Sequence, residues 1–188
     1  MNPAALFGLI ASALVVGAAG ALLFPRLPRI VALAAAGLAL APVFAGESVA
    51  MWVHGLLGQP SATLAQLALL RCLGGTVPAL GAARRWAFVA GAGAFYGSFL
   101  GNFAGFDFFS LGYRPAGLFV GALLPFAAWL HRRGESGWLV ILGVDLAAYA
   151  LGLFDNAWNA LLDPVVVLLA LAAAFRKGRP GRSAGECS

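Results

Sequence analysis

Charged residues are scarce in this sequence. Its 188 residues include 12 Lys or Arg and seven Asp or Glu, so 10% are charged while 62% are hydrophobic, and the mean hydropathy is +0.91. A soluble domain is about one-quarter charged and half apolar. A water-soluble fold could not bury so much apolar surface, so the composition predicts an integral membrane protein. In lipid the backbone must bond to itself, which favours an all-α helical bundle.

Cysteines and enzyme motifs are also scarce. Cys72 lies in an apolar run and Cys187 near the end of the chain, a pair of settings that fits neither a disulfide nor a metal site. The sequence has no nucleotide-binding loop, zinc signature, redox CxxC or nucleophile elbow. We therefore expect no cofactor, no metal and no cofactor-dependent enzyme, and assign no catalytic residue. Basic residues interleaved with stacking aromatics are missing too, so no nucleic-acid partner is expected.

Long apolar runs, by contrast, fill residues 1–175 and predict a single transmembrane helical domain of about seven spans, with six as the alternative. Residues 47–58 mix polar and apolar side chains, which favours one interfacial helix. Gly74-Gly75 and Pro78 predict a broken third span, and Thr63 with Gln66 resembles a capping box at its start. Residues 176–188 predict a basic, disordered cytoplasmic tail. The spans are expected near residues 4–24, 30–45, 63–83, 86–105, 115–133 and 138–154, followed by a last one that starts near Ala157 or Pro164.

The basic residues predict an orientation. With seven spans, nearly all of them fall on one side of the membrane, and the exceptions are Arg71 and Arg114. The positive-inside rule then places the amino terminus outside and the carboxyl terminus in the cytoplasm of a bacterial inner membrane, with the lipid bilayer as the partner. The residues on the cytoplasmic side would be Arg26, Arg29, Arg84, Arg85, Arg132, Arg133 and the basic residues of the tail.

A glycine row marks the fourth span. Gly93, Gly97, Gly101 and Gly105 recur every fourth residue, as in a glycine zipper, with phenylalanines on another face. Small residues let transmembrane helices approach closely, so the row predicts a central, tightly packed helix. The alternative is a small-residue face that binds another membrane subunit.

Arg71 and Asp145 form the first candidate site. Each lies roughly eight or nine residues into its span, which predicts a position near mid-membrane. Charges there are costly, so the two side chains are expected to meet each other or to line a water-filled cavity. Beside a broken helix they suggest a site for a substrate or ion, completed by Tyr149 and Cys72. The alternative is an ion pair with a structural role.

Polar residues at the outer face form a second candidate site, able to hold a polar solute, a divalent ion or a lipid headgroup. A histidine among carboxylates could also perform acid-base chemistry. The alternative is that these side chains only cap helices and solvate loops. The residues are Glu47, His54, Asp107, Tyr113, Arg114, Asp155, Asn156, Asn159 and Asp163.

Three functions follow from these patterns. A small-solute transport or substrate-binding membrane component predicts that Arg71 and Asp145 line a cavity. A lipid-active membrane enzyme predicts that His54, Asp107 and Asp155 converge at headgroup depth. An assembly or scaffold subunit predicts an exposed small-residue face. The intramembrane charges and the broken third span favour the first, because simple packing requires neither.

Overall fold

The computed structural model describes residues 2–26, 28–44, 46–100, 109–113 and 116–175. Asp107, Arg114, Gly101, Gly105 and the tail 176–188 lie outside these residues. Of the described residues, 76% are helical, which confirms the all-α prediction.

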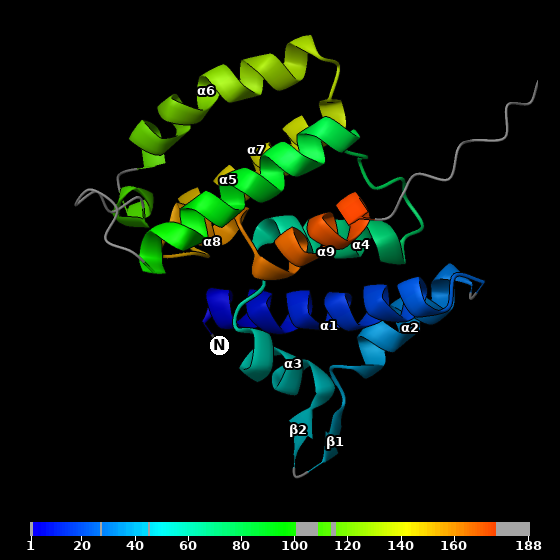
Figure 1. Ribbon diagram of the computed structural model, residues 1–188. Coiled ribbons are helices and arrows are strands. Elements are labelled where there is room, and N and C mark those ends of the chain that lie inside the picture. Colours follow the sequence, from blue (N-terminus) through cyan, green and yellow to red (C-terminus); the bar gives the residue numbers. More distant parts are fainter. Residues whose placement is uncertain (1, 27, 45, 101–108, 114–115, 176–188) are drawn as a thin grey trace, which may run out of the picture.

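Figure 1 shows how the helices of the described residues are arranged. Two short antiparallel strands and a 3-10 helix interrupt their sequence. The elements in order are α1 (Pro3–Leu23), α2 (Arg29–Leu38), β1 (Pro42–Phe44), β2 (Glu47–Ser48), α3 (Val49–Leu57), α4 (Ala62–Cys72), α5 (Ala82–Leu100), η2 (Phe109–Tyr113), α6 (Ala116–Arg132), α7 (Ser136–Ala150), α8 (Ala157–Leu161) and α9 (Pro164–Phe175).

Helix α1 packs against α2, α3 and α4. Its closest crossing is at Gly17, where an added Cβ would lie 2.5 Å from the Ala32 carbonyl oxygen and 3.1 Å from the Cys72 sulfur. Ala18, Ala32 and Cys72 are all buried there. Small side chains at this crossing allow the three backbones to approach closely.

The glycine row of α5 does not have this role. Positions Gly93 and Gly97 have no atom within 4 Å of where a Cβ would lie. The extensive contact of α5 is with α9, and it includes an edge-to-face pair of Trp86 with Phe175. The close helix approach expected at the glycine row is therefore not formed at Gly93 and Gly97, the two members of the row that the structure describes.

The structure interrupts the expected helices at more places than the sequence predicts. Helix α4 ends at Cys72 and Gly74 has φ +66°, so the helix break predicted at Gly74-Gly75 is confirmed. The second helix is shorter than expected, because α2 ends at Leu38 and Pro42–Phe44 pairs with Glu47–Ser48 as two antiparallel strands. Both proposed starts of the last span are used, since α8 begins at Ala157 and α9 at Pro164.

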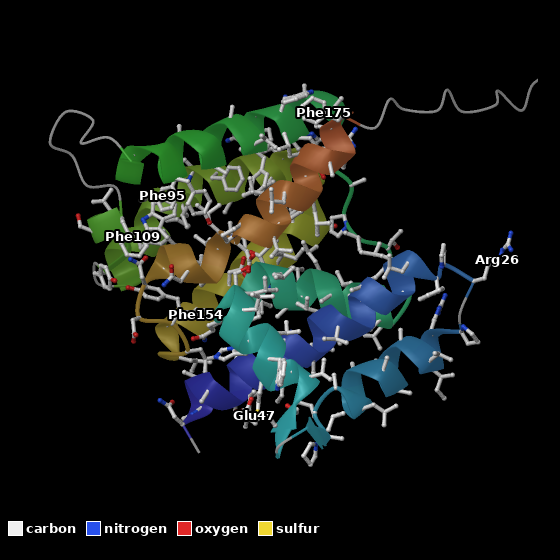
Figure 2. All side chains as sticks on the ribbon, turned by 60° about the horizontal axis from the view of Figure 1, so that its bottom comes forward. Arg26, Glu47, Phe95, Phe109, Phe154 and Phe175 are labelled. Atoms are coloured by element: carbon white, nitrogen blue, oxygen red, sulfur yellow. The ribbon has the colours of Figure 1, made fainter. Side chains whose placement is uncertain are left out.

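Among the described residues, one helix, α1, is long and apolar enough to cross a membrane, and α2, α4, α7 and α9 are shorter apolar helices. The seven-span arrangement is not confirmed by this result. The α1–α2 turn, the start of α5, the α6–α7 turn and the end of α9 nevertheless lie toward one end of the bundle (Figure 1). Arg26 and Phe175 lie toward that end in Figure 2, with Phe109 and Phe154 toward the other. We call the end that holds Arg26 the basic end and the end that holds Phe154 the opposite end.

Candidate functional site

Asp145 on α7 is the central residue of the candidate site. It is 1% exposed. Its Oδ2 lies 2.5 Å from the Thr63 hydroxyl oxygen, and its Oδ1 accepts a hydrogen bond of 2.8 Å from the Gln66 side-chain amide. The ion pair of the described residues joins Arg84 to Glu135. Within that part of the chain, Asp145 is thus a buried acid with polar neighbours and no cationic partner.

Thr63 and Gln66 are functional candidates that the sequence reasoning missed. They were expected to form a capping box, but Ser61 caps α4 instead, and its hydroxyl accepts a 3.0 Å hydrogen bond from the Leu64 amide. Three residues apart on a helix, Thr63 and Gln66 share a face, and this face contacts α7. The sequence signal for this pair was two polar side chains three residues apart in the first turns of a largely apolar helix.

The start of α4 is joined to the break between α8 and α9. Asp163 Oδ2 accepts a 2.9 Å hydrogen bond from the Ser61 amide, and Oδ1 accepts a 2.8 Å bond from the Val165 amide. Asp163 therefore satisfies amides at the first turns of two helices, where a negative charge is favourable. The predicted capping role of Asp163 is confirmed. The Thr63 hydroxyl also lies 3.1 Å from the Leu161 carbonyl oxygen, the second link between these segments.

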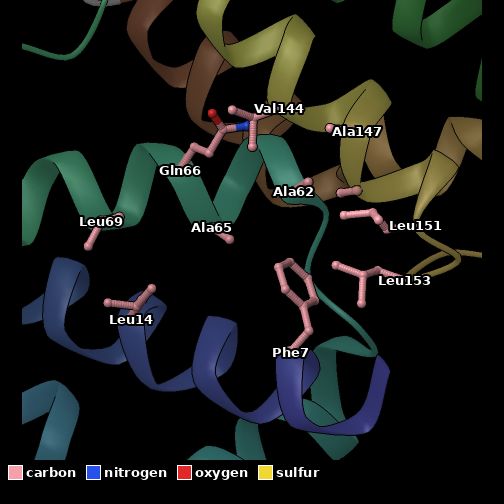
Figure 3. A pocket seen from close by; sticks show the side chains of 11 residues that line it. Phe7, Leu14, Ala62, Ala65, Gln66, Leu69, Val144, Ala147, Leu151 and Leu153 are labelled. Carbon is pink, nitrogen blue, oxygen red and sulfur yellow. The ribbon is translucent and has the colours of Figure 1, made fainter. Parts of the chain in front are cut away.

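An apolar cavity of about 320 Å³ opens between α1, α4 and α7 beside this cluster (Figure 3). Gln66 is among the residues that line the cavity, and its side-chain amide bonds Asp145. The cavity is therefore one side chain away from the buried acid. Its other lining residues include Phe7, Leu14, Leu69, Val144, Ala147, Leu151 and Leu153.

Arg71 lies at the other end of α4 and does not pair with Asp145. Its Nη2 donates a 2.7 Å hydrogen bond to the Ala21 carbonyl, in the last turn of α1. Arg85 bonds the Ala173 carbonyl near the end of α9 in the same way. Both arginines satisfy carbonyls that a helix end leaves without partners. The expected meeting of Arg71 with Asp145 is not formed, because Arg71 lies in the last turn of α4, which ends at Cys72.

One of the polar residues expected near the outer face, Asn156, attaches η2 to the rest of the fold together with Tyr149. The Tyr149 hydroxyl donates a 3.0 Å hydrogen bond to the Gly112 carbonyl. Asn156, which is 0% exposed, donates a 3.1 Å bond to the Phe109 carbonyl and accepts a 2.8 Å bond from the Trp158 amide. These contacts hold η2 against α7 and α8, and the Tyr149 hydroxyl bonds η2 rather than Asp145.

Among the described residues, no hydrogen bond or ion pair joins the other outer-face candidates to one another. His54 packs against Gly8 of α1, and its buried Nδ1 has no partner among the described residues. Glu47 is exposed in β2, and Asp155 and Asn159 are exposed near α8. Tyr113 is 59% exposed. No group of three His, Cys, Asp or Glu side chains in the described ranges could hold a metal ion.

Comparison of the chain with models of protein families, with curated protein sequences and with solved structures finds no match. The candidate site must therefore be interpreted from its own chemistry.

Proposed function

We propose that this protein is a multispanning bacterial inner-membrane protein that binds a small solute, as a transport or substrate-binding component. The apolar composition and the long apolar helix α1 support the membrane location. The gathering of basic turns at one end of the bundle supports an orientation with that end in the cytoplasm. In this orientation the amino terminus is outside.

The observation that carries the proposal is the buried Asp145 beside a cavity and a helix break. Ionisable residues inside apolar bundles are costly, and they mark binding sites or ion pathways more often than simple packing. Backbone breaks within such bundles are accepted where they lie in protein or line a cavity. Here the start of α4, the α8–α9 break and Asp145 are joined by hydrogen bonds to Thr63 and Asp163.

The cavity lining indicates the class of solute. Its wall is apolar except for Gln66, and no lining residue is a cation. We therefore propose a small, largely apolar solute with one hydrogen-bonding group, placed at the Gln66 amide. A volume of about 320 Å³ lies at the lower end of the range for ligand pockets.

A second candidate function, an assembly or scaffold subunit, is favoured by the open glycine face of α5. No atom that the structure describes in another part of the chain lies within 4 Å of a Cβ at Gly93 or Gly97. The lipid-active enzyme has less support, because no hydrogen bond or ion pair of the described residues joins His54 to Asp155.

Thermal unfolding of the purified protein in lipid nanodiscs tests solute binding. The probes are octanol, octylamine and octanoate, which share one apolar chain and differ in their charge. We expect octanol to raise the unfolding temperature and octylamine and octanoate to have no effect, because the apolar cavity offers no opposite charge to an ammonium or a carboxylate. A lack of any shift with all three probes would argue against the proposed solute class.

A matched pair of variants on α7 separates cavity binding from partition into the lipid. Ala147→Trp fills the cavity from its wall, while Ala150→Trp adds the same bulk at an exposed position that does not line it. The first is expected to abolish the shift and the second to preserve it. Equal shifts in both variants would refute the cavity as the binding site.

A further inference from the structure

The hydrogen-bond network around Asp145 requires one more hydrogen than its neighbours supply. The network has four contacts. Gln66 Nε2 contacts Asp145 Oδ1 and, at 3.2 Å, the Ile141 carbonyl. The Thr63 hydroxyl contacts Asp145 Oδ2 and the Leu161 carbonyl. A glutamine amide group carries two hydrogens and a threonine hydroxyl carries one. Carbonyl oxygens carry none, and a protonated Asp145 supplies the fourth hydrogen.

We infer that Asp145 is the proton-binding site of this protein and holds its proton on Oδ2, from which it is donated to Thr63. The Thr63 hydroxyl can then donate to the Leu161 carbonyl, and Gln66 donates to Oδ1 and to Ile141. Every contact of the network then has its hydrogen. A separation of 2.5 Å lies within the range of O–H···O hydrogen bonds.

No charged neighbour favours an ionised Asp145. The helices packed against α7 are α4, α6 and α8. On α4 the charged residue is Arg71, which bonds Ala21, while α8 has no titratable residue and α6 carries His131 and Arg132 in its last turn. Tyr149 on α7 itself bonds Gly112. A buried acid with no cation normally becomes neutral, because desolvation penalises its charge.

Proton release would change a contact between helices. When the Oδ2–H bond breaks, the proton passes to water and the electron pair stays on the carboxylate. The single hydrogen of Thr63 then turns toward Asp145, and the Leu161 carbonyl at the end of α8 loses its donor. Proton binding at Asp145 therefore strengthens the link between α4 and the α8–α9 break.

The proton site at Asp145 deepens the proposed function, and its coupling to solute binding rests on that function. Gln66 faces the solute cavity and also bonds Asp145. A solute that accepts a hydrogen bond from Gln66 competes with the acid for the same amide. The proton is thus the ion we expect to be coupled to solute binding.

Two asparagine substitutions test the protonation state. In Asp145→Asn the new NH₂ replaces the proposed O–H donor toward Thr63, so the variant mimics the protonated acid. In the control Asp163→Asn the NH₂ faces backbone amides that are themselves donors. We expect the unfolding temperature at neutral pH to stay within about 2 °C for Asp145→Asn, and to fall by about 4 °C or more for Asp163→Asn. If Asp145→Asn is destabilised as strongly as the control, or fails to fold, the proton assignment is wrong.

Infrared spectroscopy of the reconstituted full chain gives an independent measurement. At neutral pH the wild-type protein should show the carbonyl stretch of a protonated carboxyl group, and Asp145→Asn should lack it. The absence of this band in the wild type would overturn the proton site, while the probe-induced thermal shifts could remain and preserve solute binding. A band present without any probe-induced shift would support the proton site and refute only the solute proposal.

Discussion

The backbone amide of Ser61 donates a 2.9 Å hydrogen bond to the Asp163 carboxylate. Because Asp163 also accepts from the Val165 amide at the start of α9, one buried acid satisfies the first turns of two helices that are about one hundred residues apart in sequence. An anion at this point would have to displace Asp163. The arrangement therefore leaves Asp145, rather than a pair of free helix ends, as the candidate site for a ligand.

Two substitutions at Ser61 should separate the two bonds made there. Ser61→Ala removes the hydroxyl cap but keeps the amide, and should lower the free energy of unfolding by about 1 kcal/mol. Ser61→Pro removes both groups, and its φ of −64° already suits proline. The loss of a hydrogen bond to a charged acceptor should cost a further ~1.5–3 kcal/mol. Denaturant unfolding of both variants measures the difference, and equal losses would mean that the Ser61–Asp163 bond contributes nothing.

Thr63→Val should destabilise the protein because it removes the hydroxyl between Asp145 and the Leu161 carbonyl without changing the side-chain shape. An unsatisfied buried polar group costs about 1–3 kcal/mol. Thr63→Ser keeps the hydroxyl and should retain most of the stability. Thr76→Val, the matching change at an exposed threonine, should leave stability unaltered. A loss for Thr63→Val no larger than for Thr76→Val, in thermal unfolding, would argue against the network.

Alanine substitutions in two glycines should have opposite effects. Gly17→Ala places a Cβ 2.5 Å from the Ala32 carbonyl oxygen at the α1–α2 crossing, and overpacking of this kind costs about 1–3 kcal/mol. Gly93→Ala adds a Cβ in open space and should stabilise α5 by up to about 1 kcal/mol through helix propensity. If Gly93→Ala instead lowers the unfolding temperature, the glycine face of α5 is covered by a partner, and analytical ultracentrifugation should show an oligomer that the variant weakens.

Arg71 and Asp145 should behave as independent residues in a double-mutant cycle. They share no hydrogen-bond partner, since Arg71 bonds Ala21 and Asp145 contacts Thr63 and Gln66. The effects of Arg71→Met and Asp145→Asn on the free energy of unfolding should therefore add within about 0.5 kcal/mol. A coupling well above this value would show that the two side chains interact after all.

The sequence by itself determined the helical class, the basic turns and several breaks. Glycine, proline and capping residues act on their own neighbours, so Gly74 could be recognised as the end of a helix and Asp163 as a cap without knowledge of the fold. The hydrophobic composition fixed the all-α class for the same reason, because backbone hydrogen bonds within a helix are local. The number of spans and the solute remain predictions.

Only the tertiary structure decided the partners of the buried polar groups. Arg71 and Thr63 lie on the same helix but at opposite ends, and which of them meets Asp145 depends on how α4 is placed against α7. The glycine row shows the same limit, since its spacing defines a face of α5 but not which helix covers it. The contact between Thr63 and Asp145 joins residues 82 positions apart. Such contacts follow from the rotation and depth of whole helices, which no local pattern records.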